Sequence, residues 1–463
     1  MAGSTVKRLP RVDRVTARPE LDDARKRLGP RLVVGLVRAA IEERRQAILA
    51  DPTIEVPAEE SVAADVRARV ERLLGSRARR VINATGVVLH TNLGRAPLGP
   101  EAARAVHESA LGYSSIELDL RTGKRGGRGR FLEAALVSLT GAEAAVAVNN
   151  CAAGVLLLLA ALARGRDVIV SRGELVEIGG GFRVPEIMSE SGARLVEVGT
   201  TNKTRASDYA RALDASPDAA AILRIHQSNF VQLGFVERPS VQDLAQLARD
   251  RSVLLLEDIG GGALIDLKPA GLAGEPTVAS SIAAGADAVA FSGDKVLGGP
   301  QAGIVVGKSA VIERMRRHPL ARAIRLGRLP MAALEATLEP YLEGRAVEAL
   351  PILGLVHEPV ERVRSRADAW AAELGKRGVA ATVVATEAEM GGGAVPGRTL
   401  GSAAVRIEPR GERADELAAR LRTGAVPVLG RVQDDALLLD ARTVLAGEDD
   451  ALLDAVAAAV GAP

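Results

Sequence analysis

Residues 287–303 read D-A-V-A-F-S-G-D-K-V-L-G-G-P-Q-A-G, an apolar run that ends in a glycine-rich turn carrying Lys295. The run predicts a buried strand, because short apolar segments bounded by turn residues are typical of strands covered on both faces. The surrounding pattern, described below, extends this strand into an α/β sheet.

The lysine in this turn is itself informative. Only eight of the 60 Lys and Arg residues are lysines, so Lys295 points to a task that arginine cannot perform. Arginine stays protonated, whereas a lysine amine can lose its proton and form a Schiff base. The motif therefore suggests a lysine that binds pyridoxal phosphate (PLP) through its aldehyde. The alternative is a lysine that caps the loop and pairs with Asp294.

The composition is that of a globular protein with two or three domains: 463 residues, 47% hydrophobic, 25% charged, net charge +2. An aromatic content of 2% argues against base stacking as a main binding mode. One cysteine, Cys151, allows no internal disulfide, and the longest apolar run, 151–163, is too short to cross a bilayer. We expect a cytoplasmic protein without a membrane contact, and without a metal site because the five histidines are scattered.

Residues 1–75 predict a separate helical domain, with helices at 31–50 and 62–74 where apolar residues recur at helical spacing. Within residues 1–50, twelve Lys and Arg against six Asp and Glu give a local charge of +6. This charge suits contact with a polyanion, and a solvated helical arm used in assembly fits it equally well.

Residues 76–334 alternate apolar strands with helical stretches, which predicts a parallel sheet covered by helices on both faces. Ligands of such sheets bind at the carboxyl ends of the strands. The predicted strands are 144–148, 167–171, 194–198, 221–225, 253–257 and 288–292.

Residues 335–463 predict a smaller α+β domain. Its predicted elements are helices at 359–377 and 413–422, strands at 403–407 and 436–439, and a glycine-rich loop at 390–401.

A PLP site also needs an acid at the pyridine nitrogen, amide donors for the phosphate and a polar neighbour for the ring hydroxyl. Asp258 ends an apolar strand beside a glycine turn and is the candidate acid. Glu257 is the reserve, and capping of a helix is the structural alternative for Asp258.

The phosphate site is predicted at the start of the apolar helix that follows strand 144–148. The backbone amides of Cys151, Ala152 and Ala153 would bind the anion there, and the Ser292 hydroxyl could add a donor. The Cys151 side chain also fits a purely structural role as a small buried residue.

The segment after strand 221–225 supplies the candidates for the ring hydroxyl. Either Asn229 or Ser228 could bind it, and we take Asn229 as the prediction. His226 fits a place over the cofactor ring and a place in the core equally well.

Five motifs together make the chain resemble the bacterial L-seryl-tRNA(Sec) selenium transferase family, the selenocysteine synthases, over nearly its full length. They are R-V-I-N-A-T-G-V-V-L-H-T-N-L-G-R-A-P-L (80–98), Y-S-S-I-E-L-D-L-R-T-G-K-R-G-G-R (113–128), G-G-G-F-R-V-P-E-I-M (179–188), G-T-T-N-K-T (199–204) and F-S-G-D-K-V-L-G-G-P-Q-A-G (291–303).

The resemblance implies a fold-type I PLP-dependent transferase with a mostly parallel seven-stranded sheet, in which Lys295 matches the cofactor lysine. It implies seryl-tRNA(Sec) as substrate and selenophosphate as selenium donor, through β-elimination to a dehydroalanyl intermediate and addition of selenium. It further implies a homo-oligomer, a ring of dimers amounting to a decamer, and a tRNA-binding role for residues 1–75.

The resemblance also assigns Arg95, Arg322 and Arg325 to the selenophosphate site, where the planar guanidinium suits phosphate-like groups. A solvated basic face is the alternative for Arg322 and Arg325. Other cations with open roles are Arg121, Lys124, Arg125, Arg128 and Arg130, for a tRNA backbone or a subunit contact, and Arg431 and Arg442, for the substrate.

Two rival functions remain at this stage. One is a related PLP-dependent lyase that acts on a small amino acid or amino sugar acid without tRNA, which would have no need of the basic helical domain. The other is a tRNA-binding or assembly protein that kept the fold without the chemistry, against which Asp258 and Lys295 argue.

Overall fold

The computed structural model describes residues 6–178, 181–409 and 411–461. The first two residues of the 179–188 motif therefore lie outside the described residues. The chain divides into two compact units, Met1–Arg80 and Val81–Pro463. Among the described helices, none combines the length and the apolar character needed to cross a membrane.

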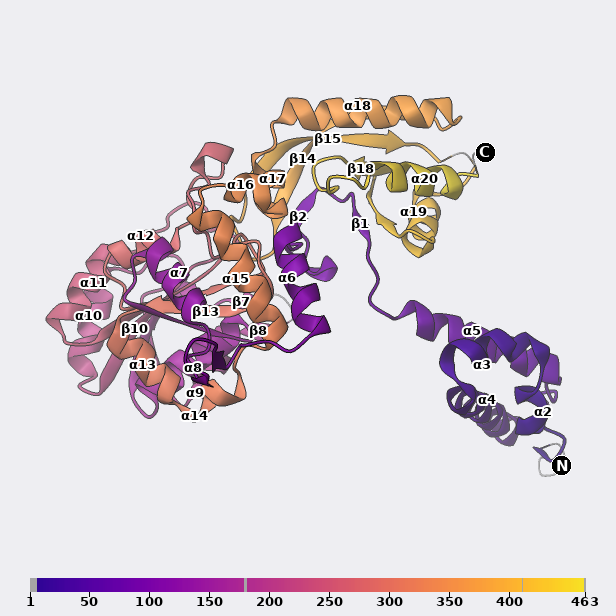
Figure 1. Cartoon of the computed structure of the whole chain (residues 1–463), viewed down its shortest axis with the longest axis horizontal. Coiled ribbons are helices and arrows are strands. Elements are labelled where there is room, and N and C mark those ends of the chain that lie inside the picture. Colours follow the sequence, from indigo (N-terminus) through magenta and orange to yellow (C-terminus); the bar gives the residue numbers. More distant parts are fainter. Residues whose placement is uncertain (1–5, 179–180, 410, 462–463) are drawn as a thin grey trace. The chain divides into compact units, whose positions relative to one another are not determined.

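The first unit is a small bundle of helices around its own apolar core (Figure 1). The predicted helices at 31–50 and 62–74 are confirmed as α4 and α5, whose buried valines and isoleucine face each other at helical spacing. The elements of this unit are α2 (Val12–Thr16), η1 (Pro19–Leu21), α3 (Asp22–Leu28), α4 (Pro30–Ala50) and α5 (Glu59–Gly75).

The second unit is built on a seven-stranded sheet with the order β5-β13-β12-β11-β10-β6-β9. Its strands are β5 (Ala144–Val148), β6 (Asp167–Ser171), β9 (Arg194–Val198), β10 (Ala219–Ile225), β11 (Leu254–Gly260), β12 (Ala288–Ser292) and β13 (Gly303–Gly307). Six of them point the same way, and β13 is the reversed strand, because it pairs antiparallel with both β12 and β5. All six predicted strands are confirmed, and β13 is added to them.

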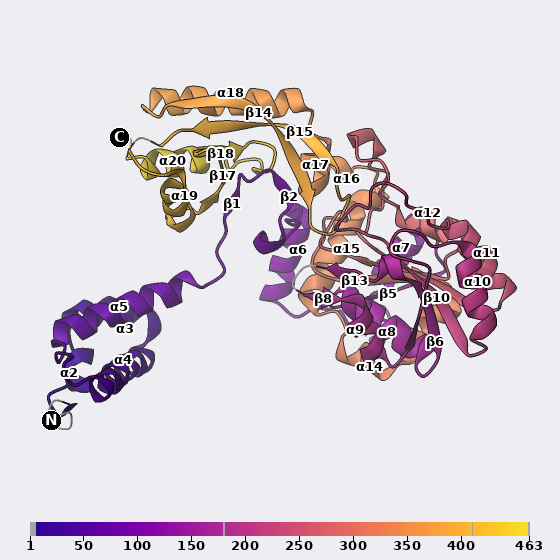
Figure 2. The same cartoon turned by 180° about the vertical axis from the view of Figure 1, so that it is seen from behind.

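Helices cover both faces of this sheet (Figures 1 and 2). In β12, Ala288 and Ala290 belong to the apolar cluster on one face, and Val289 and Phe291 to the cluster on the other. Burial on both faces explains why this strand reads as a continuous apolar run. The covering helices are α8 (Cys151–Ala163), α9 (Val184–Ser191) and α13 (Ser309–Arg317) on the first face, and α7 (Arg130–Thr140), α10 (Ala206–Ala215), α11 (Val241–Asp250), α12 (Val278–Ala283) and α15 (Arg328–Leu342) on the second.

The C-terminal part of this unit forms a five-stranded sheet with the order β17-β18-β15-β14-β2. The predicted helices at 359–377 and 413–422 and strands at 403–407 and 436–439 correspond to α18, α19, β15 and β18. The elements are β14 (Ala381–Gly391), β15 (Thr399–Ile407), β17 (Arg431–Gln433), β18 (Ala436–Asp440), β2 (Val87–Leu89), α18 (Val360–Lys376), α19 (Ala414–Thr423) and α20 (Asp449–Ala459).

Two predicted domain limits differ from the structure. Strand β2 pairs with β14 in the five-stranded sheet, and β1 (Ile82–Asn83) forms a separate two-stranded sheet with β16 (Val428–Leu429). The start of the predicted 76–334 domain therefore pairs with C-terminal strands. Residue 335 falls inside α15, whose buried Leu334 and Leu338 continue into the core of the large sheet. Neither limit has a local sequence signal, because one depends on distant strand partners and the other on a continuous helix.

The predicted loop at 390–401 is shorter in the structure. Strand β14 ends at Gly391 and β15 begins at Thr399, so the turn of this hairpin is 392–398. Strand β14 was missed because residues 385–389 read A-T-E-A-E, and alanine and glutamate are depleted in strands.

Shorter elements complete the second unit. They are α6 (Pro100–Leu111), α14 (Pro319–Ala323), α16 (Ala346–Ala349), α17 (Pro351–His357), β3 (Leu118–Asp119), β4 (Lys124–Arg125), β7 (Glu177–Ile178), β8 (Phe182–Arg183), η2 (Thr91–Leu93), η3 (Arg172–Glu174) and η4 (Lys268–Ala270).

Candidate active site

Three neighbouring parallel strands, β10, β11 and β12, end at one cavity of about 250 Å³. This is the edge at which ligands of parallel sheets bind. Seven of the predicted site residues line this cavity: Arg95, Cys151, Ala152, His226, Asp258, Ser292 and Lys295. Ser228 and Gln301 line it as well.

Lys295 lies in the loop that follows β12, and its side chain is buried against the cavity. The loop is tied together by backbone bonds from Gly293 to Ala302 and from Val296 to Gly261. Within the described part of the chain, the Lys295 amine makes no hydrogen bond or ion pair. Asp294 instead pairs with Arg95, with 2.7 Å between Oδ2 and Nη1. The alternative in which Lys295 pairs with Asp294 is therefore excluded, and the amine is free for a ligand.

Asp258 is buried at the end of β11, and its two carboxylate oxygens differ in their contacts. Oδ1 accepts the Gly260 amide at 3.0 Å and the Cys151 thiol at 3.5 Å. Among the described residues, Oδ2 has no hydrogen-bond partner. Burial raises the pKa of Asp258, and the Lys295 amine and the Cys151 thiol offset part of that rise. One oxygen is thus anchored by the protein while the other remains available to a ligand.

Glu257, the reserve candidate, faces away from this cavity. Its Oε1 lies 3.3 Å from Nη1 of Arg224, and it does not line the cavity. Successive residues of a strand point to opposite faces, so only one of two adjacent carboxylates can reach the site. The structure therefore favours Asp258.

The start of α8 meets the cavity, as predicted for a phosphate site. The Asn150 side chain caps the helix by accepting the Ala153 amide at 2.9 Å. Ala153 is therefore not a free donor, whereas Cys151 and Ala152 line the cavity at the helix N-terminus. Burial, with the neighbouring Asp258 carboxylate, raises the pKa of Cys151, so its side chain remains a thiol that donates to Asp258.

Asn229 does not lie at this cavity. It is exposed, and its amide nitrogen donates to the Glu177 carbonyl at 2.8 Å. The adjacent Ser228 is buried and lines the cavity in its place. The sequence did not separate the two, because both are small polar residues in an irregular segment after β10.

Arg95 brings a positive charge to the Lys295 cavity. It has a left-handed backbone with φ +65°, directly after Gly94 with φ +91°. Such a conformation is uncommon for arginine and marks a backbone that its surroundings constrain. The pairing with Asp294 holds the guanidinium beside the cavity that contains Lys295.

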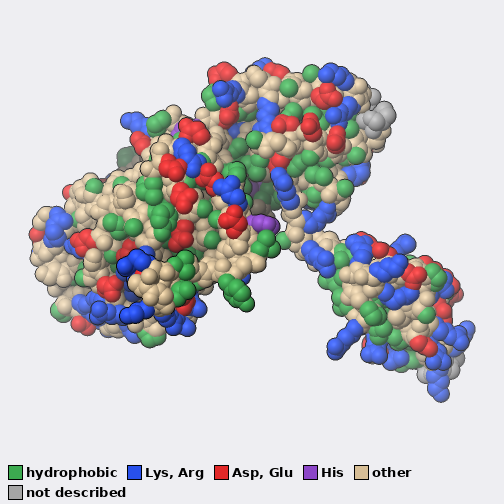
Figure 3. Space-filling model, in the orientation of Figure 1, with side chains coloured by type: hydrophobic (Ala, Val, Ile, Leu, Met, Phe, Trp, Pro, Cys, Tyr) green, Lys and Arg blue, Asp and Glu red, His purple; other side chains and the backbone are tan. Residues whose placement is uncertain are grey.

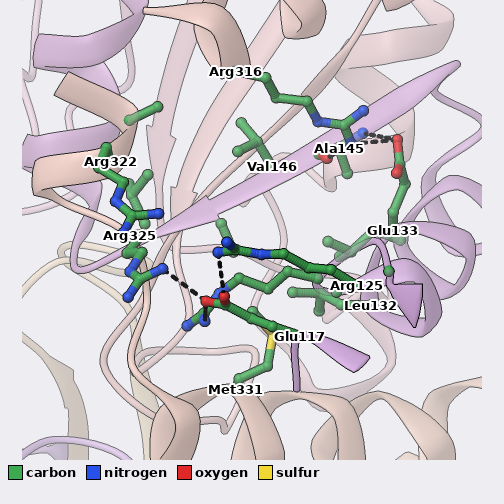
Figure 4. A pocket seen from close by; sticks show the side chains of 17 residues that line it. Glu117, Arg125, Leu132, Glu133, Ala145, Val146, Arg316, Arg322, Arg325 and Met331 are labelled. Carbon is green, nitrogen blue, oxygen red and sulfur yellow. Dashed lines mark hydrogen bonds and ion pairs between the residues drawn. The ribbon is translucent and has the colours of Figure 1, made fainter. Parts of the chain in front are cut away.

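Arg322 and Arg325 lie elsewhere, in a second cavity of about 390 Å³ (Figure 4). Arg125, Arg128 and Arg316 also line it, so five arginines share it with the carboxylates of Glu117 and Glu133. This cavity is strongly cationic and could bind a polyanion. Within one chain, the structure does not bring Arg322 and Arg325 into the Lys295 cavity.

Glu117 is the centre of the ion pairs in this second cavity. Its oxygens lie 2.6 Å from Arg125, 2.7 Å from Arg325 and 3.1 Å from Arg128. The hydrogen bond from Arg125 and the nearby guanidinium groups hold the pKa of Glu117 below its ordinary value. Arg322 makes no ion pair with any described residue, so its charge is the least compensated of the group.

The two C-terminal arginines lie outside both cavities. Arg442 is buried and donates to the carbonyls of Leu355 at 2.8 Å, Glu358 at 2.9 Å and Gly401, which joins the C-terminal sheet to the segment before α18. This is a structural role. Arg431 lies in the edge strand β17.

The residues at the Lys295 cavity fit PLP. A free amine suits the aldehyde, an unpaired carboxylate oxygen suits the pyridine nitrogen, and helix amides with a buried serine suit the phosphate. The predicted Lys295, Asp258, Cys151, Ala152 and Ser292 supply these groups. Sequence reasoning missed Gln301 and the Asp294–Arg95 pair, although all three lie inside motifs that it quoted.

Comparison with known proteins extends these findings. A family model described as L-seryl-tRNA selenium transferase matches residues 81–445, and one described as the selenocysteine synthase N-terminal region matches residues 6–45. The chain is 43% identical to the L-seryl-tRNA(Sec) selenium transferase of Hyphomonas neptunium, over 98% of both chains. It is 45% identical to the enzyme of that name from Moorella thermoacetica, over 98% of this chain and 97% of the other.

Among solved structures, a D-glucosaminate-6-phosphate ammonia-lyase is similar, with a TM-score of 0.59 and 23% identity. The similarity covers 85% of this chain and 98% of the other, and it concerns the fold. The predicted fold-type I architecture is confirmed.

Proposed function

The chain belongs to the L-seryl-tRNA selenium transferase family, and we propose that it converts L-seryl-tRNA(Sec) to L-selenocysteinyl-tRNA(Sec) with selenophosphate as selenium donor. The observation that carries this proposal is the free Lys295 amine, buried in one cavity with Asp258 and the start of α8. The rival lyase reaction has less support, because the relatives at 43–45% identity carry the transferase name.

The cofactor is pyridoxal phosphate. When bound, it supplies an aldehyde that condenses with amines and a ring that withdraws electrons from the substrate α-carbon. Lys295 would hold the aldehyde, Asp258 Oδ2 the protonated ring nitrogen, and the Cys151 and Ala152 amides with Ser292 the phosphate. These assignments rest on the lining of the cavity and on the unpaired oxygen of Asp258.

Proton transfer at the substrate is the proposed task of Lys295. With the seryl amine bound in place of Lys295, the freed Lys295 amine can accept the proton from the serine α-carbon. A proton is then delivered to the serine β-hydroxyl, which leaves as water. The selenium of selenophosphate then forms the new bond to the β-carbon while the α-carbon takes back a proton. Water then attacks phosphorus and breaks the selenium–phosphorus bond, which releases phosphate. Arg95, held by Asp294, lies where it can bind the donor's phosphate group.

The first unit is proposed to bind the tRNA. Its matched family region, residues 6–45, carries the whole local charge of +6, and Figure 3 shows Lys and Arg side chains spread over the surface of this unit. Such a surface suits a phosphate backbone. A tRNA substrate also supports the proposed cytoplasmic location.

We further propose a homo-oligomer in which Arg322 and Arg325 of one copy complete the Lys295 cavity of another. Two observations support this. The arginines expected at one selenophosphate site are divided between two cavities of the chain. The segment beside Glu117 exposes large apolar side chains, with Leu111 77% and Leu120 76% exposed, which suits a contact between copies.

Mixed oligomers test this arrangement. Lys295→Ala and the double variant Arg322→Ala/Arg325→Ala should each be inactive alone, and co-expression should restore roughly a quarter of wild-type activity. The fraction follows because half of randomly formed dimers are mixed and one of their two sites is intact. Lys295→Ala mixed with Arg95→Ala is the control without recovery, since both changes lie in one cavity. If the first mixture shows no recovery of activity, a site shared between two copies is excluded.

Conversion of seryl-tRNA(Sec) by the purified protein tests the function itself. With PLP and selenophosphate we expect selenocysteinyl-tRNA(Sec), detected after deacylation of the tRNA. KM for the charged tRNA should rise steeply with salt, because phosphate contacts release counterions. Free serine should not react. A protein that binds PLP and releases ammonia from a small amino acid, while it leaves the charged tRNA unchanged, would be the rival lyase.

A further inference from the structure

The middle of the β14–β15 hairpin turn (392–398), Gly393 to Val395, is buried against the core of the large sheet. Ala394 is fully buried and Val395 is 3% exposed, and both belong to the apolar cluster that contains Ile259 and Phe291. A Cβ atom at Gly393 would lie 2.5 Å from Nζ of Lys295. The hairpin turn therefore lies directly against the cofactor lysine, with space only for glycine at the contact.

Glu275 connects this hairpin turn to His226. Its side chain is 1% exposed, and Oε2 accepts the Val395 amide at 3.0 Å. The same oxygen lies 3.4 Å from Nε2 of His226, which lines the Lys295 cavity. Glu275 itself does not line that cavity. It contacts His226 and the hairpin turn from outside the cavity.

The surroundings leave Glu275 little freedom. A Cβ atom at Gly261, in the turn after Asp258, would overlap Oε1 of Glu275. Oε1 has no hydrogen-bond partner among the described residues, so the Val395 amide and His226 are the polar neighbours of this carboxylate. A buried carboxylate is expensive unless polar groups compensate it, which argues that its place is set by these two contacts.

The hairpin turn in return depends on Glu275. Val395 has φ +46°, a left-handed conformation that is strained for a β-branched residue. Such a conformation persists only where surrounding contacts impose it. The hydrogen bond from the Val395 amide to Glu275 is one of these contacts.

We propose that Glu275 is a positioning residue that fixes His226, on the wall of the Lys295 cavity, and the hairpin turn, which packs against Lys295. Its effect on selenium transfer rests on the proposed function, whereas its effect on the cavity does not. Removal of the carboxylate releases the Val395 amide and His226 together, which opens the cavity beside Lys295 while every group that contacts the cofactor remains present.

The test measures PLP binding and trypsin cleavage of the full chain, both without tRNA. Arg398 is exposed at the end of the hairpin turn and offers a trypsin site there. Glu275→Ala should weaken PLP binding about 10-fold or more, shift the absorption band of the bound cofactor and speed cleavage after Arg398, because a buried hydrogen bond to a charge is lost. Glu275→Gln should restore protection of Arg398, since its side-chain oxygen can still accept the Val395 amide.

Asp287→Ala is the matched control. Asp287 is also buried, and it accepts the Leu255 amide at 2.7 Å, at the opposite end of the same strands from Lys295. This variant should lose stability without the absorption shift or the faster cleavage after Arg398. Wild-type PLP affinity and wild-type cleavage in Glu275→Ala would overturn the proposal, as would the same changes in Asp287→Ala. Failure of selenium transfer by the wild-type protein would count against the proposed function alone.

Discussion

Lys295→Ala is expected to reduce selenium transfer to seryl-tRNA(Sec) by at least about 10³-fold, the largest effect of any single substitution in this chain. The reason is that one amine has two proposed tasks, to hold the cofactor aldehyde and to move the α-proton, and alanine can do neither. The structure leaves no nearby substitute, since no other lysine lines the cavity. Single-turnover conversion of the charged tRNA is the measurement.

Two further observations make this result specific. The absorption band of the lysine–cofactor bond should disappear in Lys295→Ala, while binding of the charged tRNA should stay within about 2-fold of wild type because the proposed tRNA contacts lie in the first unit. Lys268→Ala, a change at an exposed lysine outside the cavity, is the control and should keep full activity. A Lys295→Ala protein that still turns over would exclude Lys295 as the cofactor lysine.

Asp258→Asn should lower kcat by about 10²-fold or more, with a much smaller change in the affinity for the charged tRNA. Asparagine keeps the size of the side chain, and its oxygen can still accept the Gly260 amide and the Cys151 thiol. What it removes is the negative charge that keeps the ring nitrogen protonated, and with it the ability of the ring to accept electrons. The measurement is kcat and KM beside the cofactor absorption spectrum.

Glu257→Gln separates Asp258 from its neighbour. Glu257 is equally buried and adjacent in sequence, but it pairs with Arg224 on the other side of β11. This variant should lose some stability and keep kcat, whereas Asp258→Asn should do the reverse. Equal losses of kcat in both variants would mean that the charge of the region, and not one oxygen of Asp258, supports the chemistry.

The sheet could be predicted because its strands are buried on both faces and therefore read as separate apolar runs. β13 escaped prediction because it begins and ends in glycine and follows the Lys295 loop directly. Those glycines are required, since a Cβ atom at Gly303 would overlap the Asn150 carbonyl and one at Gly307 the Asp287 carbonyl. Close packing against backbone that is distant in the sequence requires glycine at both positions, and no local sequence pattern reveals this packing.

Prediction of the candidate site was limited in the same way, by contacts between residues far apart in the sequence. Lys295, Asp258 and Cys151 follow strands of one sheet, so their meeting at one edge was predictable. Asn229 and Ser228 are neighbours in an irregular segment, and only the fold decides which of them faces inward. The contact of Glu275 with Val395 joins residues 120 positions apart, and neither residue has a sequence signal of its own.

The pairing of β1 and β2 with strands near the C-terminus has a consequence for how the protein is made. Residues 82–89 leave the ribosome early, but their partners in β14 and β16 lie some 300 positions later in the chain. The helical first unit, whose core lies within residues 9–74, can fold during synthesis, whereas the five-stranded sheet must wait for its last strands. The hairpin turn beside Lys295 belongs to that late part. Cofactor loading therefore follows synthesis of nearly the whole polypeptide, so a prematurely terminated chain cannot hold its cofactor in a complete site.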